Sequence, residues 1–82
     1  MAVILDDYDV VKVHNHGRNR YTFFLLLDGP RDIALADLAT ELNVYRDVMS
    51  YRGERYYALS GIEKRMNPED AQWIATIESE RI

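Results

Sequence analysis

Residues 35–52 read LADLATELNVYRDVMSYR, and the fold class depends on the structure that this stretch adopts. In its first half, apolar side chains recur at spacings of three, four and seven residues, at Leu35, Leu38, Ala39 and Leu42. This spacing is typical of an α-helix that buries one side. Asp32 is a suitable N-cap, because its carboxylate can accept a hydrogen bond from the first turn. The sequence predicts a helix over about residues 33–43.

The second half of the stretch has two interpretations. Val44, Val48 and Tyr51 lie at helical spacing, which predicts a second short helix. A hairpin that turns at Arg52-Gly53 is the alternative, and one of its faces would carry Tyr45, Met49, Tyr51, Tyr57 and Leu59. Gly53 fits both interpretations, either after the last helical residue or at a turn position with positive φ.

The N-terminal third predicts a β-hairpin. Residues 8–14 alternate weakly, residues 15–19 (NHGRN) have the composition of a turn, and residues 20–27 (RYTFFLLL) are mostly apolar. Because the second strand is apolar at both parities, we expect both faces of the sheet to be covered there.

The C-terminal third predicts one more strand and then helices. Residues 55–59 have the composition of a strand, and Ser60-Gly61-Ile62-Glu63 matches a capping box for a short helix through Met66. Asn67-Pro68-Glu69-Asp70 is typical of a helix start, and the apolar face of that helix would be formed by Trp73, Ile74 and Ile77. The expected fold class is α+β, a single domain over residues 1–82. An N-terminal β-hairpin and a short antiparallel sheet would be packed by two main helices, at about residues 33–43 and 68–80.

The stretch 35–52 resembles the helix-turn-helix motif of DNA-binding proteins. Leu38, Ala39 and Leu42 match its first helix. Asn43 stands where the family usually has glycine, Val44 stands where an apolar residue fills the core, and Val48, Met49 and Ser50 match the second helix. The resemblance covers roughly a fifth of the chain. It implies base recognition by Tyr45, Arg46, Asp47, Ser50 and Tyr51, with Arg52 and Arg55 on phosphates.

Composition restricts the class of protein. The chain has 82 residues, is 48% hydrophobic and contains no cysteine. This apolar content is too high for a disordered tail, and the lack of thiols excludes disulfides, thiolate metal sites and a cysteine nucleophile. The longest apolar run, residues 23–27, is too short to span a bilayer, and no basic region precedes residues 2–5. We therefore expect a cytoplasmic protein that has no contact with membranes.

Charge is unevenly distributed along the chain. The formal net charge is −4, yet residues 12–27 contain three basic side chains and no acidic one: Lys12, Arg18 and Arg20. These three form a second basic patch, in addition to the basic residues within the stretch 44–66. Eight of the ten basic residues are arginine, which suits phosphate contacts and protein interfaces alike.

No arrangement typical of an enzyme or a metal centre is found. His14 and His16 share one face of a strand, but the sequence places no third ligand beside them. Asp6, Asp7 and Asp9 lack the spaced glycine and terminal glutamate of a calcium loop. We expect no catalytic residues, no metal and no cofactor.

Two functions from different classes remain after these exclusions. The first is a small transcription regulator that binds DNA through the helix-turn-helix-like segment, with a homodimer as its expected state. The second is an acidic inhibitor that binds a host protein, of the kind that phages and mobile elements encode. Such an inhibitor would use aromatic and arginine anchors and block a nucleic-acid-binding site.

Overall fold

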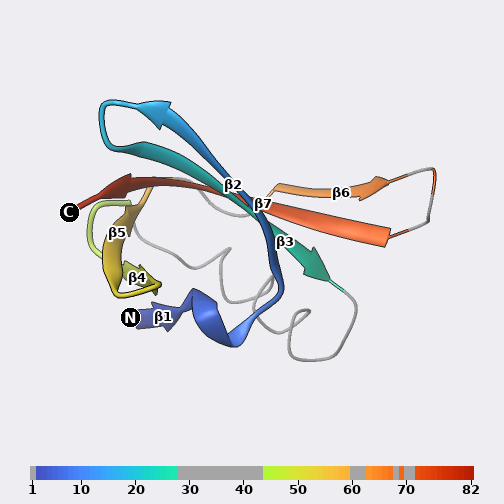
Figure 1. The fold of residues 1–82 in the computed structure, drawn as a ribbon, viewed down its shortest axis with the longest axis horizontal. Helices are drawn as coiled ribbons and strands as arrows, with labels where there is room; N and C mark the ends of the chain where they lie inside the picture. The colour runs from blue at the N-terminus through green and yellow to red at the C-terminus, as the bar shows by residue number, and fades with distance from the viewer. Residues whose placement is uncertain (1, 28–43, 60–62, 68, 70–71) are drawn as a thin grey trace.

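The computed structural model describes residues 2–27, 44–59, 63–67, 69 and 72–82, and it shows a protein built almost entirely of β-strands (Figure 1). The elements, in chain order, are β1 (Ala2–Ile4), the 3-10 helix η1 (Leu5–Asp7), β2 (Val10–Gly17), β3 (Arg20–Leu27), β4 (Val48–Tyr51), β5 (Glu54–Ala58), β6 (Glu63–Asn67) and β7 (Gln72–Arg81). They form one sheet in the order β1-β4-β5-β7-β3-β2, and β6 also pairs with β7.

Strand β7 is the centre of this sheet. One of its edges pairs antiparallel with β3 from Trp73 to Glu80. The other edge is shared, because β6 pairs with its first half and β5 with its last three residues. The hairpin of β6 and β7 therefore extends past the rest of the sheet, as Figure 1 shows.

The two end strands of the sheet are neighbours in the chain. Strand β1 pairs in parallel with β4 at one end, and the chain then passes through η1 to become β2 at the other end. In Figure 1 this N-terminal segment crosses from one end of the curved sheet to the other. Just before β2, this segment contacts β3: the backbone N of Leu26 donates a 2.9 Å hydrogen bond to the carbonyl of Asp9. The buried apolar side chains of the described residues form one cluster on the inner side of the curved sheet.

Two hairpins depend on residues with positive φ. The β2–β3 turn contains Arg18 (φ 55°) and Asn19 (φ 62°), and the β4–β5 turn contains Arg52 (φ 49°) and Gly53 (φ 81°). Two consecutive residues with positive φ match the twist that a tight hairpin requires. The N-terminal hairpin is thus confirmed, and of the two interpretations of residues 44–57 the hairpin turning at Arg52-Gly53 is correct.

The core lies on the inner face of the sheet and is built from alternate residues of the strands. Its buried apolar side chains are Val3, Leu5, Phe23, Leu25, Met49, Tyr56, Ala58, Ala75 and Ile77. Ser79 is also fully buried, and its hydroxyl donates a 3.0 Å hydrogen bond to the carbonyl of Tyr21. A buried hydroxyl with a partner avoids most of the desolvation cost.

The expected α+β class with two main helices is wrong. Residues 72–80, predicted as helix, belong to β7, and the described part of the chain contains no helix longer than three residues. Trp73, Ile74 and Ile77 lie at helical spacing, which suggested a helix. In the strand, the buried positions are Ala75, Ile77 and Ser79. Because Ala75 is small and Ser79 is polar, the sequence does not show the apolar alternation of a strand. Residues 63–66, predicted as part of a short helix, belong to β6 (Glu63–Asn67). The helix expected over residues 33–43 lies outside the described residues.

The resemblance to a helix-turn-helix motif is also wrong. Its second helix would cover residues 44–52, which the structure shows as a turn, strand β4 and the start of the β4–β5 turn. Tertiary pairing with β1 and β5 outweighs the weak helical spacing of Val44, Val48 and Tyr51. DNA recognition by a helix in this segment therefore loses its structural basis.

Among the described residues, no helix is both long and apolar enough to cross a membrane.

Candidate functional site

The side of the sheet that faces away from the core carries a continuous band of polar and aromatic side chains. We call it the outer face and define it by the pairing register of β2, β3, β5 and β7. Its members are Lys12, His14, His16, Arg20, Thr22, Phe24, Tyr57, Glu78 and Glu80. Residues paired directly across adjacent strands point to the same side, so these side chains are neighbours.

One end of the outer face holds a group of residues from four segments, which we call the Tyr–Arg cluster: Arg20, Tyr45, Tyr57 and Glu80. The rings of Tyr45 and Tyr57 are 6.1 Å apart between centroids and tilted edge to face. Arg20 Nη2 donates to the Tyr45 hydroxyl at 3.4 Å, while its Nε lies 3.9 Å from Glu80 Oε1. Tyr45 nevertheless keeps 50% of its surface exposed. The cluster thus presents an aromatic surface whose charged groups are held in place.

Tyr45 is held in an unusual backbone conformation. Its φ is 62°, in the left-handed region that side chains with a Cβ rarely adopt. The backbone N of Tyr45 donates to the carbonyl of Ala58 at 3.0 Å, and the backbone N of Ala58 donates to the carbonyl of Asp47 at 3.2 Å. These bonds fix the turn to the end of β5 and direct Tyr45 towards Tyr57. Strain of this kind costs about 1 to 2 kcal/mol and is concentrated at functional sites.

The next part of the outer face is a hydrogen-bonded group, the His–Thr–Glu cluster of His14, His16, Thr22 and Glu78. The Thr22 hydroxyl donates to Glu78 Oε2 at 2.8 Å and lies 2.6 Å from His16 Nε2. Because this hydroxyl has one proton and gives it to Glu78, its oxygen accepts from His16, which places a proton on Nε2. The centroid of the His14 ring lies 4.3 Å from that of the His16 ring, and the two ring planes are tilted by 57°. Within the described ranges, no three potential ligands are placed to hold a metal ion.

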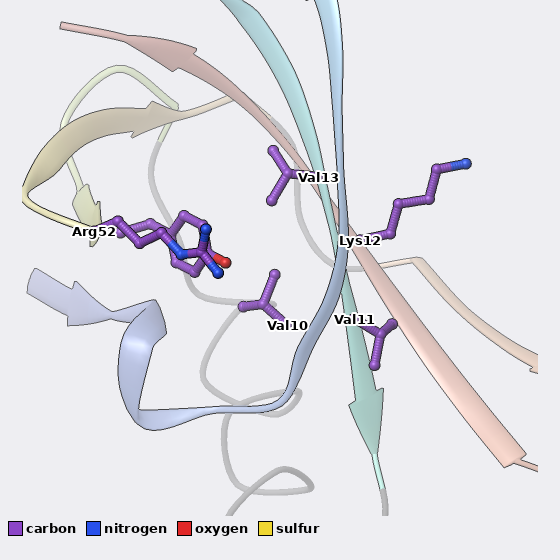
Figure 2. Close-up of a pocket in the computed structure, with 6 residues that line it drawn as sticks. Val10, Val11, Lys12, Val13 and Arg52 are labelled. Atoms are coloured by element: carbon purple, nitrogen blue, oxygen red, sulfur yellow. The ribbon is translucent and has the colours of Figure 1, made fainter.

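A groove lies on the other side of β2, between this strand and the β4–β5 turn (Figure 2). It has a volume of about 260 Å³ and is lined by Val10, Val11, Lys12, Val13, Tyr51 and Arg52. Figure 2 shows that Val10 and Val13 point towards Arg52, whereas Lys12 leaves β2 on the opposite side. Lys12 Nζ lies 5.3 Å from the centre of the Phe24 ring, and the Arg52 guanidinium lies 5.2 Å from that of Tyr51. The surface of the groove is therefore mostly polar, with the side chains of Val10 and Val13 on one wall and cations at its borders.

Three of the predicted binding residues lie in these two places, and the others lie in neither. Tyr45 joins the Tyr–Arg cluster, and Tyr51 and Arg52 line the groove. Asp47 is buried with 4% exposure, Arg46 is exposed in the turn before β4, and Ser50 is paired with Arg55 across β4 and β5.

The second basic patch is divided in the same way. Lys12 lines the groove, Arg20 belongs to the Tyr–Arg cluster, and Arg18 lies in the β2–β3 turn. The structure thus brings together residues from two separately predicted sets, Arg20 with Tyr45 and Lys12 with Arg52.

Sequence reasoning missed Tyr57, Thr22, Glu78 and Glu80 as members of a surface. Each becomes a neighbour of the others only through the pairing of β3, β5 and β7. The alternation of residues 54–58 was the available signal, because it separates buried Tyr56 from Tyr57 on the opposite face.

Comparison with protein-family models, curated proteins and solved structures finds no match for this chain.

Proposed function

We propose that this protein is a non-enzymatic regulator that acts by binding another protein through the Tyr–Arg cluster. The observation that carries the proposal is the conformation of Tyr45, an exposed tyrosine held at positive φ so that its ring meets Tyr57 and its hydroxyl meets Arg20. Folding alone would be served better by asparagine or glycine at this position. A strained, half-exposed aromatic side chain is best explained by a role in binding.

The chemistry of the cluster favours a protein partner. Tyrosine and arginine are the residue types most enriched among side chains that dominate binding energy at protein interfaces. The edge-to-face contact of Tyr45 with Tyr57 fixes both rings before binding, which lowers the entropy lost when a partner covers them.

Charge supports the same choice of partner. Arg20 already has Glu80 at 3.9 Å, and Glu78 lies on the same face, so a nucleic-acid phosphate would meet carboxylates beside the cation. The formal charge of −4 favours association with a protein of opposite charge. Nucleic-acid-binding proteins carry such a positive charge. The proposal includes inhibition of a protein of this class, in which this chain would occupy the site that normally binds phosphates.

Site-specific photo-crosslinking tests the proposal. A benzophenone side chain is placed at Tyr57 in one variant and at Asp7, on η1 and away from the outer face, in a matched control. Each protein is irradiated in a lysate of the cells that produce it. We expect a protein crosslinked from position 57 but not from position 7, and we expect Arg20→Ala to reduce its yield by about tenfold.

Two results would overturn the proposal. One is equal crosslinking from positions 57 and 7, which would mean non-specific contact. The other is tight binding of random-sequence DNA or RNA that weakens steeply with salt and is lost in Arg20→Ala, which would identify the cluster as a phosphate site.

A further inference from the structure

Strand β2 has one edge that no described strand pairs with. It is an end strand of the sheet, and its pairing partner is β3 on one side. Register shifts interrupt this pairing between Val10 and Lys12 and between Asn15 and Gly17, so Lys12–Asn15 is the regular part. An open edge presents unpaired N–H and C=O groups to any extended chain that lies beside it.

The groove of Figure 2 runs along this edge. Val13 is 37% exposed, and together with Val10 and Tyr51 it supplies an apolar wall. Successive side chains of a strand point to opposite sides. A strand added at the edge of β2 would therefore place every second side chain into the groove, and the others beside Lys12 on the outer side.

The charges around the groove select the chemistry of such a strand. Strand β2 contains Lys12 and no carboxylate, and Arg52 stands across the groove from Val10 and Val13. With its apolar side chains in the groove, an incoming strand of alternating apolar and acidic residues would place its carboxylates on the outer side, beside Lys12, while Arg52 adds a weaker attraction from across the groove. A second copy of this chain is a poorer occupant, because a second β2 brings another Lys12 and no carboxylate.

We infer that the open edge of β2 receives an extended segment of a partner protein in which apolar and acidic side chains alternate. The segment pairs with β2 through main-chain hydrogen bonds and takes its specificity from the groove, the mode known as strand addition. This site is separate from the Tyr–Arg cluster and does not depend on it.

Fluorescence anisotropy with defined peptides tests the inference on the full chain. The probe is fluorescein-labelled, amidated (Val-Glu)4, and its matched counterpart is (Val-Lys)4. Two further peptides carry N-methyl groups on every valine or on every glutamate, which removes the N–H donors along one edge or the other. We expect (Val-Glu)4 to bind, (Val-Lys)4 to bind at least about tenfold more weakly, and one N-methylated peptide to lose at least about tenfold in affinity.

Variants of the protein localise the binding. Lys12→Glu should weaken (Val-Glu)4 binding by about tenfold and Arg52→Glu by a smaller factor, while Arg55→Glu makes the same change of charge away from the groove and should leave it unchanged. Tyr57→Ala should also leave this titration unchanged, which separates the site from the proposed protein contact. Circular dichroism confirms that each variant is folded.

Several outcomes would overturn the inference. These are equal binding of the glutamate and lysine peptides, full binding of both N-methylated peptides, and a loss in Arg55→Glu as large as that in Lys12→Glu. A dimer in sedimentation experiments that Lys12→Glu strengthens would assign the edge to a second copy instead.

Discussion

The carboxylate of Asp6 accepts the backbone N–H of Arg52 with both oxygens, at 3.1 Å for Oδ1 and 3.0 Å for Oδ2. Asp6 belongs to η1, and Arg52 lies in the β4–β5 turn, so this contact joins the segment that links the two ends of the sheet to the turn at the groove. A backbone N–H in a tight turn that donates to an ionised carboxylate is held more firmly than one that donates to water.

Replacing Asp6 by alanine should lower the free energy of unfolding by about 1 kcal/mol, because the Arg52 N–H loses its acceptor while remaining close to water. Urea denaturation followed by circular dichroism measures the change. Asp7→Ala is the matched control, since Asp7 is exposed on the same short helix, and it should change stability by less than about 0.5 kcal/mol. Equal losses in the two variants would show that the contact contributes nothing specific.

Replacing Arg52 by asparagine should separate stability from binding. Arg52 has φ 49° and precedes Gly53 at φ 81°, and Asn-Gly is the pair preferred in a turn of this kind. The Asp6 contact uses the backbone, so it persists in the variant. We expect the free energy of unfolding to rise by about 0.5 kcal/mol, whereas (Val-Glu)4 binding falls because the guanidinium is removed. A variant that loses stability and keeps binding would contradict both parts.

The N-terminal hairpin could be predicted because its signals are local. Residues 15–19 have turn chemistry, and the apolar strand 20–27 follows directly, so β2 and β3 need no information from elsewhere in the chain. The hairpin at Arg52-Gly53 was one of two predicted alternatives. The prediction placed Met49 and Tyr57 on the same face of this hairpin. In the structure Met49 pairs with Tyr56, so Tyr57 lies on the opposite face.

Strand β7 could not be predicted for a physical reason. A buried strand is expected to show alternating apolar residues, but the buried positions of β7 include Ala75, which is small, and Ser79, which is polar and donates its hydroxyl to the carbonyl of Tyr21. Asn67, predicted to begin a helix, is the last residue of β6 and pairs with Gln72 of β7. The contact between Arg20 and Tyr45 could not be predicted either, because it depends on the order of β3, β7 and β5 in the sheet.

Thr22 should contribute to stability through its hydroxyl. It is 4% exposed, and its oxygen contacts both His16 and Glu78. Thr22→Val keeps the shape and removes the hydrogen bonds, so we expect a loss of about 1 kcal/mol in urea denaturation. A double-mutant cycle with Glu78→Ala should give a coupling of at least about 0.5 kcal/mol. Strictly additive effects would show that the Thr22–Glu78 contact is not formed in solution.

Tyr56 should make the protein less stable in alkali. Burial raises the pKa of its hydroxyl above the ordinary 10.0, and the neighbouring Tyr21 raises it further. Above about pH 10 the unfolded chain loses this proton while the folded chain retains it, so the free energy of unfolding falls as pH rises and is unaffected below that pH. Tyr56→Phe removes this difference between the two states. Urea denaturation at several values between about pH 8 and pH 11 should therefore show a steeper alkaline decline for the wild type than for Tyr56→Phe. Parallel declines would mean that Tyr56 ionises equally well in the folded and unfolded chains.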